Sequence, residues 1–221
     1  IMMALGTHWE WRGFGAVSGI FAERYCNLEP FYEPQTIEDI YLWIPGMQIN
    51  AKFRTGVEDG LKFKRIKNKD DDLEQWTESP NELFEFPIDT RGWNTLKGVL
   101  AEVGLKLPDY PSRAPNRADS LRCLEEIGCR ILQVNKIRET KIWRCKPVNV
   151  MVEWACITSP QSCISIGLET MEMQSGDEQY SDDEQKRHLT RAVRKMGLKK
   201  EPIKVMNYID AVRIWASGGV I

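Results

Sequence analysis

The chain has 221 residues, of which 42% are hydrophobic and 28% are charged, and its formal net charge is -2. This mixture is typical of a globular protein, and no apolar run is long enough to span a bilayer. We therefore expect a soluble, cytoplasmic protein with no membrane partner. A small negative net charge gives no general electrostatic footprint for nucleic acid, so we expect no nucleic-acid partner either.

The cysteines and histidines do not indicate a zinc site. Six cysteines are scattered along the chain and form no C-x-x-C pair, and the two histidines, His8 and His188, are far apart. Structural zinc needs paired ligands at short spacing. We expect the cysteines to be buried free thiols.

The first predicted strand is Thr7 to Gly15, where polar and aromatic residues alternate with a period of two. This period places His8, Glu10 and Arg12 on one face and two tryptophans on the other. The glycine-rich stretch from residue 13 to 19 that follows lacks the Lys-Ser/Thr ending of a P-loop. We interpret that stretch as a turn or barrel rim with no helix after it.

The next two strands form a predicted hairpin. After a turn at Pro45-Gly46, a strand ending at Thr55 places Lys52 and Arg54 on one face. After a second turn at residues 58–60, the strand Leu61 to Ile66 does the same with Lys62 and Lys64. Each strand therefore carries a pair of cations opposite apolar side chains.

The middle of the chain is less regular. The charge-dense run Lys67 to Asp72 is typical of a solvated loop. The alternating segments Leu73 to Glu78 and Leu83 to Ile88, on either side of Pro80-Asn81, predict a further hairpin. The pattern does not determine which way Glu74, Glu78 and Glu85 face.

The second half of the chain predicts helices and three more strands. Helical spacing and capping residues predict helices over Trp93 to Val103, Asp119 to Ile127, Gln185 to Met196 and Asn207 to Trp215. Alternation predicts strands over Cys129 to Trp143, Val148 to Ile157 and Ile164 to Thr170. Their polar faces carry, in order, Lys136 with Arg138, then Glu153, then Glu169.

Charged faces on nearly every strand suggest the interior of a closed barrel. If helices cover the apolar faces, the charged faces point inward, where cations would bind phosphate oxygens and carboxylates could hold a hard divalent ion. The cations in this pattern are Arg12, Lys52, Arg54, Lys62, Lys64, Lys136 and Arg138, and the carboxylates are Glu10, Glu153 and Glu169.

The order of these motifs resembles that of the triphosphate tunnel metalloenzymes, or CYTH superfamily, which includes thiamine triphosphatases, inorganic triphosphatases and one class of adenylyl cyclase. His8-Trp9-Glu10-Trp11-Arg12 resembles the family's E-x-E-x-K strand, and Lys136-Ile137-Arg138 resembles its K-x-R. Gly167-Leu168-Glu169 resembles its later E-x-E strand. The resemblance implies an α+β fold for residues 1–221 as a single domain: a closed antiparallel β-barrel of about eight strands with helices packed outside.

The resemblance also implies a divalent-metal-dependent hydrolase of inorganic triphosphate, thiamine triphosphate or a nucleoside triphosphate. The seven cations would bind the substrate, and Glu10, Glu153 and Glu169 would hold Mg²⁺ or Mn²⁺. Glu10 and Glu169 would also be catalytic, positioning the water that attacks the terminal phosphorus.

Two departures from the family pattern keep alternatives open. His8 and Gly167 stand where the family has the first carboxylate of each pair, which threatens metal binding. The alternative is a catalytically weakened protein of the same fold that binds polyphosphate or an organic polyanion. A β-sheet interaction protein with solvated charges is a third hypothesis. A cyclase is the least supported, because nothing in the sequence selects an adenine base.

Overall fold

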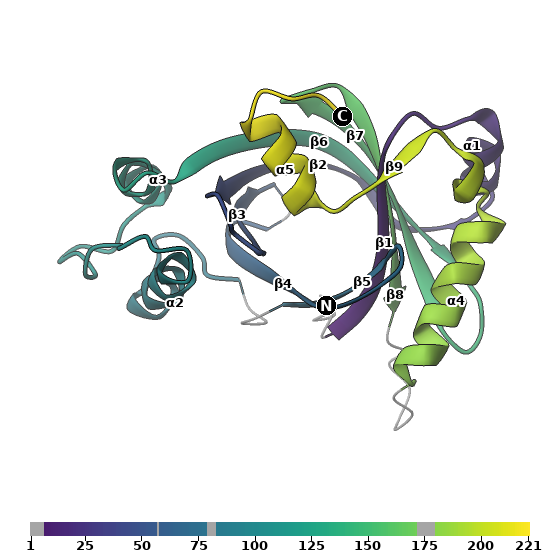
Figure 1. The fold of residues 1–221 in the computed structure, drawn as a ribbon, viewed down its shortest axis with the longest axis horizontal. Helices are drawn as coiled ribbons and strands as arrows, with labels where there is room; N and C mark the ends of the chain where they lie inside the picture. Colours follow the sequence, from purple (N-terminus) through teal and green to yellow (C-terminus); the bar gives the residue numbers. More distant parts are fainter. Residues whose placement is uncertain (1–6, 57, 79–82, 172–179) are drawn as a thin grey trace.

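The computed structural model describes residues 7–56, 58–78, 83–171 and 180–221, and in these residues eight antiparallel strands close into a barrel (Figure 1). The order around the barrel is β1, β5, β4, β3, β2, β6, β7 and β8, after which β8 pairs with β1. A short strand, β9, pairs in addition with the end of β1. The expected α+β class and closed antiparallel barrel are therefore confirmed. The strands are β1 (Thr7–Gly15), β2 (Glu29–Trp43), β3 (Ile49–Thr55), β4 (Gly60–Asp70), β5 (Leu73–Glu78), β6 (Arg130–Trp143), β7 (Asn149–Ser159), β8 (Cys163–Met171) and β9 (Ile203–Val205).

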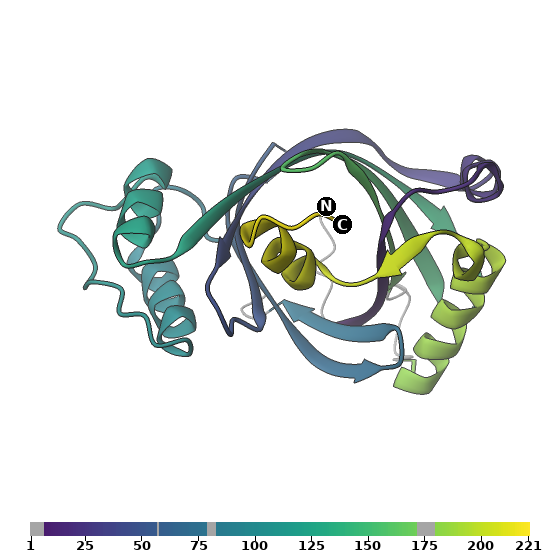
Figure 2. The same ribbon diagram turned by 45° about the horizontal axis from the view of Figure 1, so that its top comes forward.

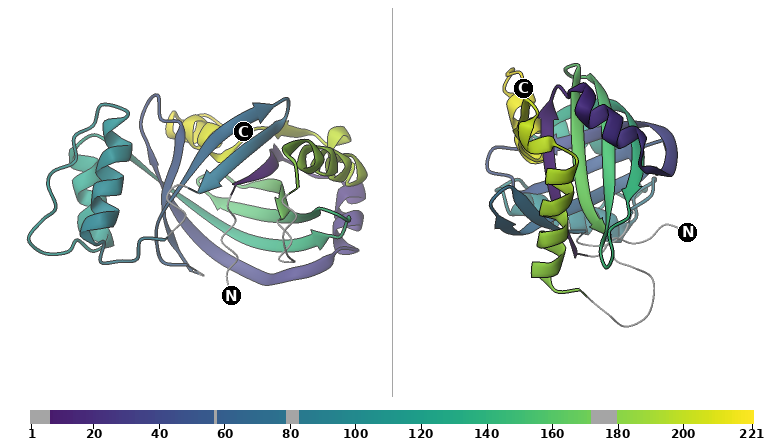
Figure 3. Two further views of the ribbon diagram at one scale, coloured as in Figure 1. Left: turned by 90° about the horizontal axis from the view of Figure 1, so that it is seen from below. Right: turned by 90° about the vertical axis from the view of Figure 1, so that its right-hand side faces the viewer.

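Four helices cover the outside of the barrel in two groups (Figures 1 and 3). One group packs on the apolar outer face of β3 and β4, and the other packs on the outer faces of β1, β7 and β8. The first group is α2 (Thr90–Ala101) with α3 (Arg117–Glu126), and the second is α1 (Gly19–Cys26) with α4 (Asp182–Lys195). Helix coverage of the outer faces leaves the alternate side chains of each strand to fill the interior.

The fifth helix, α5 (Tyr208–Ala216), lies across one end of the barrel instead of on its side (Figure 2). The side chain of Asn207 caps it by accepting a hydrogen bond from the Asp210 N–H. Its buried residues pack with apolar side chains from β1, β2, β6 and β7 to form a separate core. The barrel is thus closed at this end.

Strand β3 shows how the pattern positions the site. Ile49, Ala51 and Phe53 are buried against the α2–α3 pair. Lys52 and Arg54 alternate with these apolar residues along the strand and point into the barrel, where they line a cavity. Alternation with a period of two therefore turns the cations inward while the outer face forms a hydrophobic core.

The predictions for residues 67–72 and 83–88 are wrong. Strand β4 continues to Asp70 and pairs with Leu73 of β5 across a two-residue turn, in which Asp71 has φ of 51°. The charged residues from 67 to 71 are exposed, and Asp70 pairs with Lys186 of α4 at 2.6 Å. Segment 83–88 forms no hairpin with β5; Phe84 makes one isolated bridge to Leu61. The turn expected at Pro80-Asn81 lies outside the described residues.

Four elements were missing from the sequence prediction: α1, β2, β9 and a single 3-10 turn at Leu198–Lys200. Strand β2 begins at Glu29, and its register against β6 shifts near Pro30 and again between Tyr32 and Gln35, where Pro34 lies. Proline cannot donate to a strand ladder, so these irregularities accommodate it. Helix α1 follows the glycine-rich stretch directly, and the side chain of Ser18 caps it, which corrects the expectation that no helix follows.

Among the described residues, none of the helices has the length and apolar character needed to cross a membrane.

Candidate functional site

The barrel encloses a cavity of about 340 Å³, a size common for small-molecule sites. The structure brings all ten residues predicted to bind substrate or metal to this one cavity. They are Glu10, Arg12, Lys52, Arg54, Lys62, Lys64, Lys136, Arg138, Glu153 and Glu169. Glu58 and Glu78 also line it, so that seven cations face five carboxylates among the described lining residues. The individual roles of these residues remain predictions.

Aromatic side chains close the cavity where α5 crosses the barrel. The ring of Tyr208 stacks on Tyr41 with centroids 5.6 Å apart and meets Phe14 edge-on at 5.1 Å. Lys136 Nζ lies 4.5 Å from the centroid of Tyr208 and donates a hydrogen bond of 3.3 Å to its hydroxyl. The floor of the cavity is therefore aromatic, with a cation held against it.

The opposite end of the cavity has apolar walls. Phe31 and Tyr32 of β2 line it together with Met151 and Met171, and Tyr32 is 41% exposed. In the strand register, Tyr32 lies opposite Thr140 on β6, far along the strand from Val134, which packs beneath α5. The cavity is therefore a cup with a floor at α5 and a mouth near Tyr32.

A fully buried carboxylate, Asp39 of β2, organises the cations on one wall. It accepts hydrogen bonds from Lys52 Nζ at 3.1 Å and Arg54 Nε at 2.8 Å, and Lys136 Nζ lies 3.2 Å away. Burial alone would raise the pKa of Asp39, but these three cations hold it well below its ordinary value. Sequence reasoning missed Asp39, because β2 was not recognised as a strand.

Three cations sharing one carboxylate leave positive charge uncompensated. Burial, and then repulsion from Arg54, lower the pKa of Lys52 well below its ordinary value despite the contact with Asp39. On the adjacent wall, Glu58 accepts from Lys62 Nζ at 3.0 Å and from Arg54 Nη1 at 3.3 Å. The cations are thus fixed in position by carboxylates that do not neutralise them fully, an arrangement suited to a polyanion.

Arg12 is at the centre of the three carboxylates predicted to bind metal. Its guanidinium donates to Glu10 at 2.5 Å, to Glu153 at 2.8 Å and to Glu169 at 3.4 Å, using oxygen Oε1 of each. The second oxygen of Glu153 lies 3.6 Å from Arg138 Nη1. Burial opposes ionisation, but Arg12 outweighs it and keeps the pKa of Glu10 and of Glu153 well below the ordinary value.

Gly167 gives the guanidinium its space. It lies opposite Arg12 in the β1–β8 pairing and opposite Glu153 in the β7–β8 pairing. A Cβ at this position would lie 2.5 Å from Arg12 Nη2 and 2.7 Å from Cζ, closer than any real contact. Gly167 is therefore the residue that allows the Arg12 guanidinium to reach the three carboxylates.

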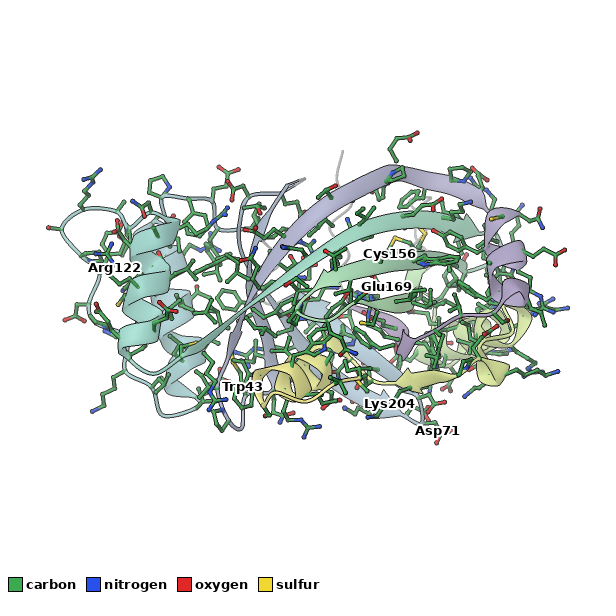
Figure 4. All side chains as sticks on the ribbon, turned by 90° about the horizontal axis from the view of Figure 1, so that it is seen from above. Trp43, Asp71, Arg122, Cys156, Glu169 and Lys204 are labelled. Atoms are coloured by element: carbon green, nitrogen blue, oxygen red, sulfur yellow. The ribbon has the colours of Figure 1, made fainter. Side chains whose placement is uncertain are left out.

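His8 is buried to 1% exposure on the other side of the same carboxylates. Its Nε2 lies 3.7 Å from Glu169 Oε2 and 3.9 Å from Glu10 Oε2. Neither ring nitrogen has a hydrogen-bond partner within the described part of the chain. His8, Glu10 and Glu169 each offer one donor atom within 4.8 Å of the other two, so these three residues fit a divalent ion. Both oxygens of Glu153 face guanidinium groups instead. Glu169, labelled in Figure 4, lies within the barrel.

The three glutamates whose facing the sequence did not determine differ in location. Glu78 lines the cavity. Glu74 accepts two hydrogen bonds from Asn207, the residue that caps α5. Glu85 is exposed.

Comparisons with known proteins give a likeness in structure alone. No protein-family model matches the sequence, and no curated protein matches it. A conserved hypothetical protein from Pyrococcus furiosus superposes with a TM-score of 0.53 at 16% identity, covering 91% of this chain and 98% of its own. A candidate adenylyl cyclase from Hippeastrum, described as having a dominant triphosphatase activity, superposes with a TM-score of 0.50 at 13% identity, covering 97% of both chains. The closed barrel is therefore a fold that this chain shares with both of these solved structures, and it is the fold that the order of the motifs had predicted.

Proposed function

We propose that the protein binds a triphosphate-containing compound in the barrel and hydrolyses it with the help of a divalent ion. The observation that carries this proposal is the convergence of seven cations from β1, β3, β4 and β6 on one cavity. Guanidinium groups match phosphate oxygens bidentately, and ammonium groups act as point charges, so such a set suits a chain of phosphates.

The cup shape supports an anchored substrate. Lys52, Arg54 and Lys136 are held near the floor by Asp39, and they are positioned before any anion arrives. Pre-positioned charges in a water-poor site stabilise developing negative charge without reorganisation. A triphosphate bound by these cations would leave any organic group toward the apolar mouth near Phe31 and Tyr32.

Hydrolysis would depend on Glu10 and Glu169. Their Oε2 atoms face away from Arg12 and are free of hydrogen bonds from it, so these oxygens can hold a divalent ion or orient a water. Mg²⁺ or Mn²⁺, when bound there, would neutralise charge on the phosphates and polarise the bond that breaks. The Hippeastrum neighbour of the same fold, with its dominant triphosphatase activity, supports this reaction class.

The Arg12 cluster favours a second candidate, which is polyanion binding with weak turnover. A guanidinium that already satisfies one oxygen of each of three carboxylates competes with a metal for them. In that case the cations would bind inorganic triphosphate or another polyphosphate tightly, and hydrolysis would be slow.

Phosphate release distinguishes the two candidates. The wild-type protein is incubated with inorganic triphosphate, thiamine triphosphate or ATP, each with Mg²⁺, with Mn²⁺ and with a chelator, and binding is measured in parallel by calorimetry. Metal-dependent phosphate release that Glu169→Gln abolishes supports the hydrolase. Binding without release supports the second candidate. The matched control is Glu102→Gln, a half-exposed glutamate outside the cavity, paired with Arg65. Release that persists in Glu169→Gln contradicts the assignment of Glu169.

A further inference from the structure

His8 is a buried residue whose chemistry the proposed triphosphate site does not use. Its side chain is 1% exposed, and both ring nitrogens lack a hydrogen-bond partner in the residues that the structure describes. An unpaired buried polar group costs free energy, so a ring placed like this calls for a partner. The His8 Nε2 atom lies 3.7 Å from Glu169 Oε2 and 3.9 Å from Glu10 Oε2.

Arg12 divides the carboxylate oxygens into two sets. Oxygen Oε1 of Glu10 and of Glu169 accepts from the guanidinium, and Oε2 of each faces His8 instead. The oxygens that Arg12 leaves free therefore converge with an imidazole nitrogen, and not with a third carboxylate. Glu153, the third predicted metal ligand, has its oxygens at Arg12 and Arg138.

The spacing of the three donors is close to that of ligands on one ion. Bonds of about 2.0 to 2.2 Å place neighbouring ligand atoms about 3 to 3.5 Å apart. The two separations from His8, 3.7 and 3.9 Å, are a few tenths of an ångström longer, and all three residues offer donor atoms within 4.8 Å of one another. Small side-chain rotations would therefore bring His8, Glu10 and Glu169 to bonding distance.

We infer that His8 Nε2, Glu10 Oε2 and Glu169 Oε2 form a mixed imidazole–carboxylate site for a divalent transition-metal ion of the Mn²⁺, Co²⁺ and Zn²⁺ class, and that this site selects against Mg²⁺. Imidazole suits transition metals, whereas Mg²⁺ takes oxygen ligands and dehydrates reluctantly. The inference rests on the proposed function in one respect, since it identifies the ion that would assist triphosphate hydrolysis.

The charges around the site affect its affinity. Arg12 and Lys64 lie near the same carboxylates: Glu169 and Glu10 raise the pKa of Lys64 against the effect of its burial. Two cations so close oppose a third, so the ion alone binds weakly. A triphosphate bound to those cations adds negative charge, and by linkage the ion and the triphosphate strengthen each other's binding.

The competing arrangement is direct contact of His8 with both carboxylates, which leaves no room for a metal. The two arrangements differ in a metal titration. The visible absorption spectrum of Co²⁺ changes when nitrogen and oxygen ligands of a protein replace its water ligands, and a cluster that holds no metal would give no such change.

The test is a titration of the wild-type protein with Co²⁺ in the absence of triphosphate, followed by visible absorption, with competition by Zn²⁺, Mn²⁺ and Mg²⁺. We expect saturable binding at one equivalent that Zn²⁺ reverses and Mg²⁺ does not. His8→Gln should weaken Co²⁺ binding at least about tenfold. His8→Glu, which supplies a carboxylate, should shift the preference toward Mg²⁺. His188→Gln removes the only other histidine, which lies in α4 outside the barrel, and should leave binding unchanged.

Two outcomes overturn the inference: Co²⁺ binding no stronger than Mg²⁺ binding in the wild-type protein, or Co²⁺ binding that survives in His8→Gln. The wild-type comparison needs no variant and is independent of any folding defect, which circular dichroism checks for His8→Gln. Because triphosphate is absent, failure here leaves the proposed function intact. Failure to bind triphosphate in a protein that binds Co²⁺ would instead contradict the proposed function alone.

Discussion

The guanidinium of Arg12 lies against the backbone of Gly167, its partner across the β1–β8 pairing, at a distance that excludes a Cβ. The absence of a side chain at position 167 therefore makes room for a planar cation, which pairs with Glu10, Glu153 and Glu169.

Gly167→Ala should destabilise the protein, because its Cβ would lie 2.5 Å from Arg12 Nη2. Displacing a packed, paired guanidinium resembles overpacking a core, and we expect a loss of about 1 to 3 kcal/mol in the free energy of unfolding. Urea unfolding measures it. The control is Gly98→Ala in α2, where a Cβ meets nothing within 4 Å. Equal effects of the two substitutions would contradict the close contact.

Arg12→Met should be more severe. It leaves three buried carboxylates without their shared partner, and removing one side of a buried ion pair costs about 3 to 5 kcal/mol. Divalent ions should then raise the melting temperature of Arg12→Met more than that of the wild-type protein, since the carboxylates are released. Arg122→Met on α3 is the control: Arg122 is 66% exposed on the outer side of the molecule (Figure 4). A cost below about 0.5 kcal/mol for Arg12→Met, the value typical of surface sites, would be inconsistent with this cluster.

Asp39→Asn should have opposite effects on stability and on binding. It removes the charge that holds Lys52, Arg54 and Lys136 together, so the free protein should melt at a lower temperature. The same change increases the net positive charge of the cup, so inorganic triphosphate should raise the melting temperature more than in the wild-type protein. Thermal unfolding with and without triphosphate tests both parts. A smaller ligand-induced rise would show that Asp39 is needed for binding geometry and not only for holding the cations.

Lys52 should take up a proton when a polyanion binds. Burial and the neighbouring Arg54 lower the pKa of Lys52 well below 10.5 in the free protein. At pH values between this lowered pKa and 10.5, the Lys52 amine is neutral in the folded state and protonated in the unfolded state. In this window the folded state binds fewer protons, and stability rises with pH. A bound phosphate favours the charged form and raises the pKa again, so triphosphate affinity should fall as pH rises through the same window.

Calorimetry in two buffers of different ionisation enthalpy, at mildly alkaline pH, measures this proton uptake. The wild-type protein should show buffer-dependent binding enthalpies, and Lys52→Met should show a smaller dependence. Buffer-independent enthalpies for the wild-type protein across that pH window would contradict a lowered pKa at Lys52.

The sequence predicted those parts of the fold that depend on local alternation. Lys52, Arg54, Lys136 and Arg138 lie in strands with a clear period of two, and the structure places them on the cavity. Asp39 was missed because its strand begins with prolines at positions of irregular register, which weaken the local pattern.

Contacts between distant segments could not be predicted from local patterns. Tyr208 forms the floor of the cavity by stacking on Tyr41, which lies 167 residues earlier in the chain. No periodicity in the sequence links the two residues. The contact between Gly167 and Arg12 also joins distant segments, because the two residues are 155 positions apart in the chain. The glycine in the sequence does not by itself indicate that an arginine on another strand occupies the space beside it. Such pairings are set by the closure of the barrel.

Binding of inorganic triphosphate, measured by calorimetry at two salt concentrations, tests the central claim most directly. The wild-type protein should bind it, with an affinity that falls as salt rises, and Lys136→Met with Arg138→Met should weaken binding at least about tenfold, because each removes a cation from the cup. Lys199→Met, which removes a 55% exposed lysine outside the cavity, should have no effect. Absence of binding in the wild-type protein, or equal binding by the folded double variant, would contradict a cationic barrel built for a triphosphate.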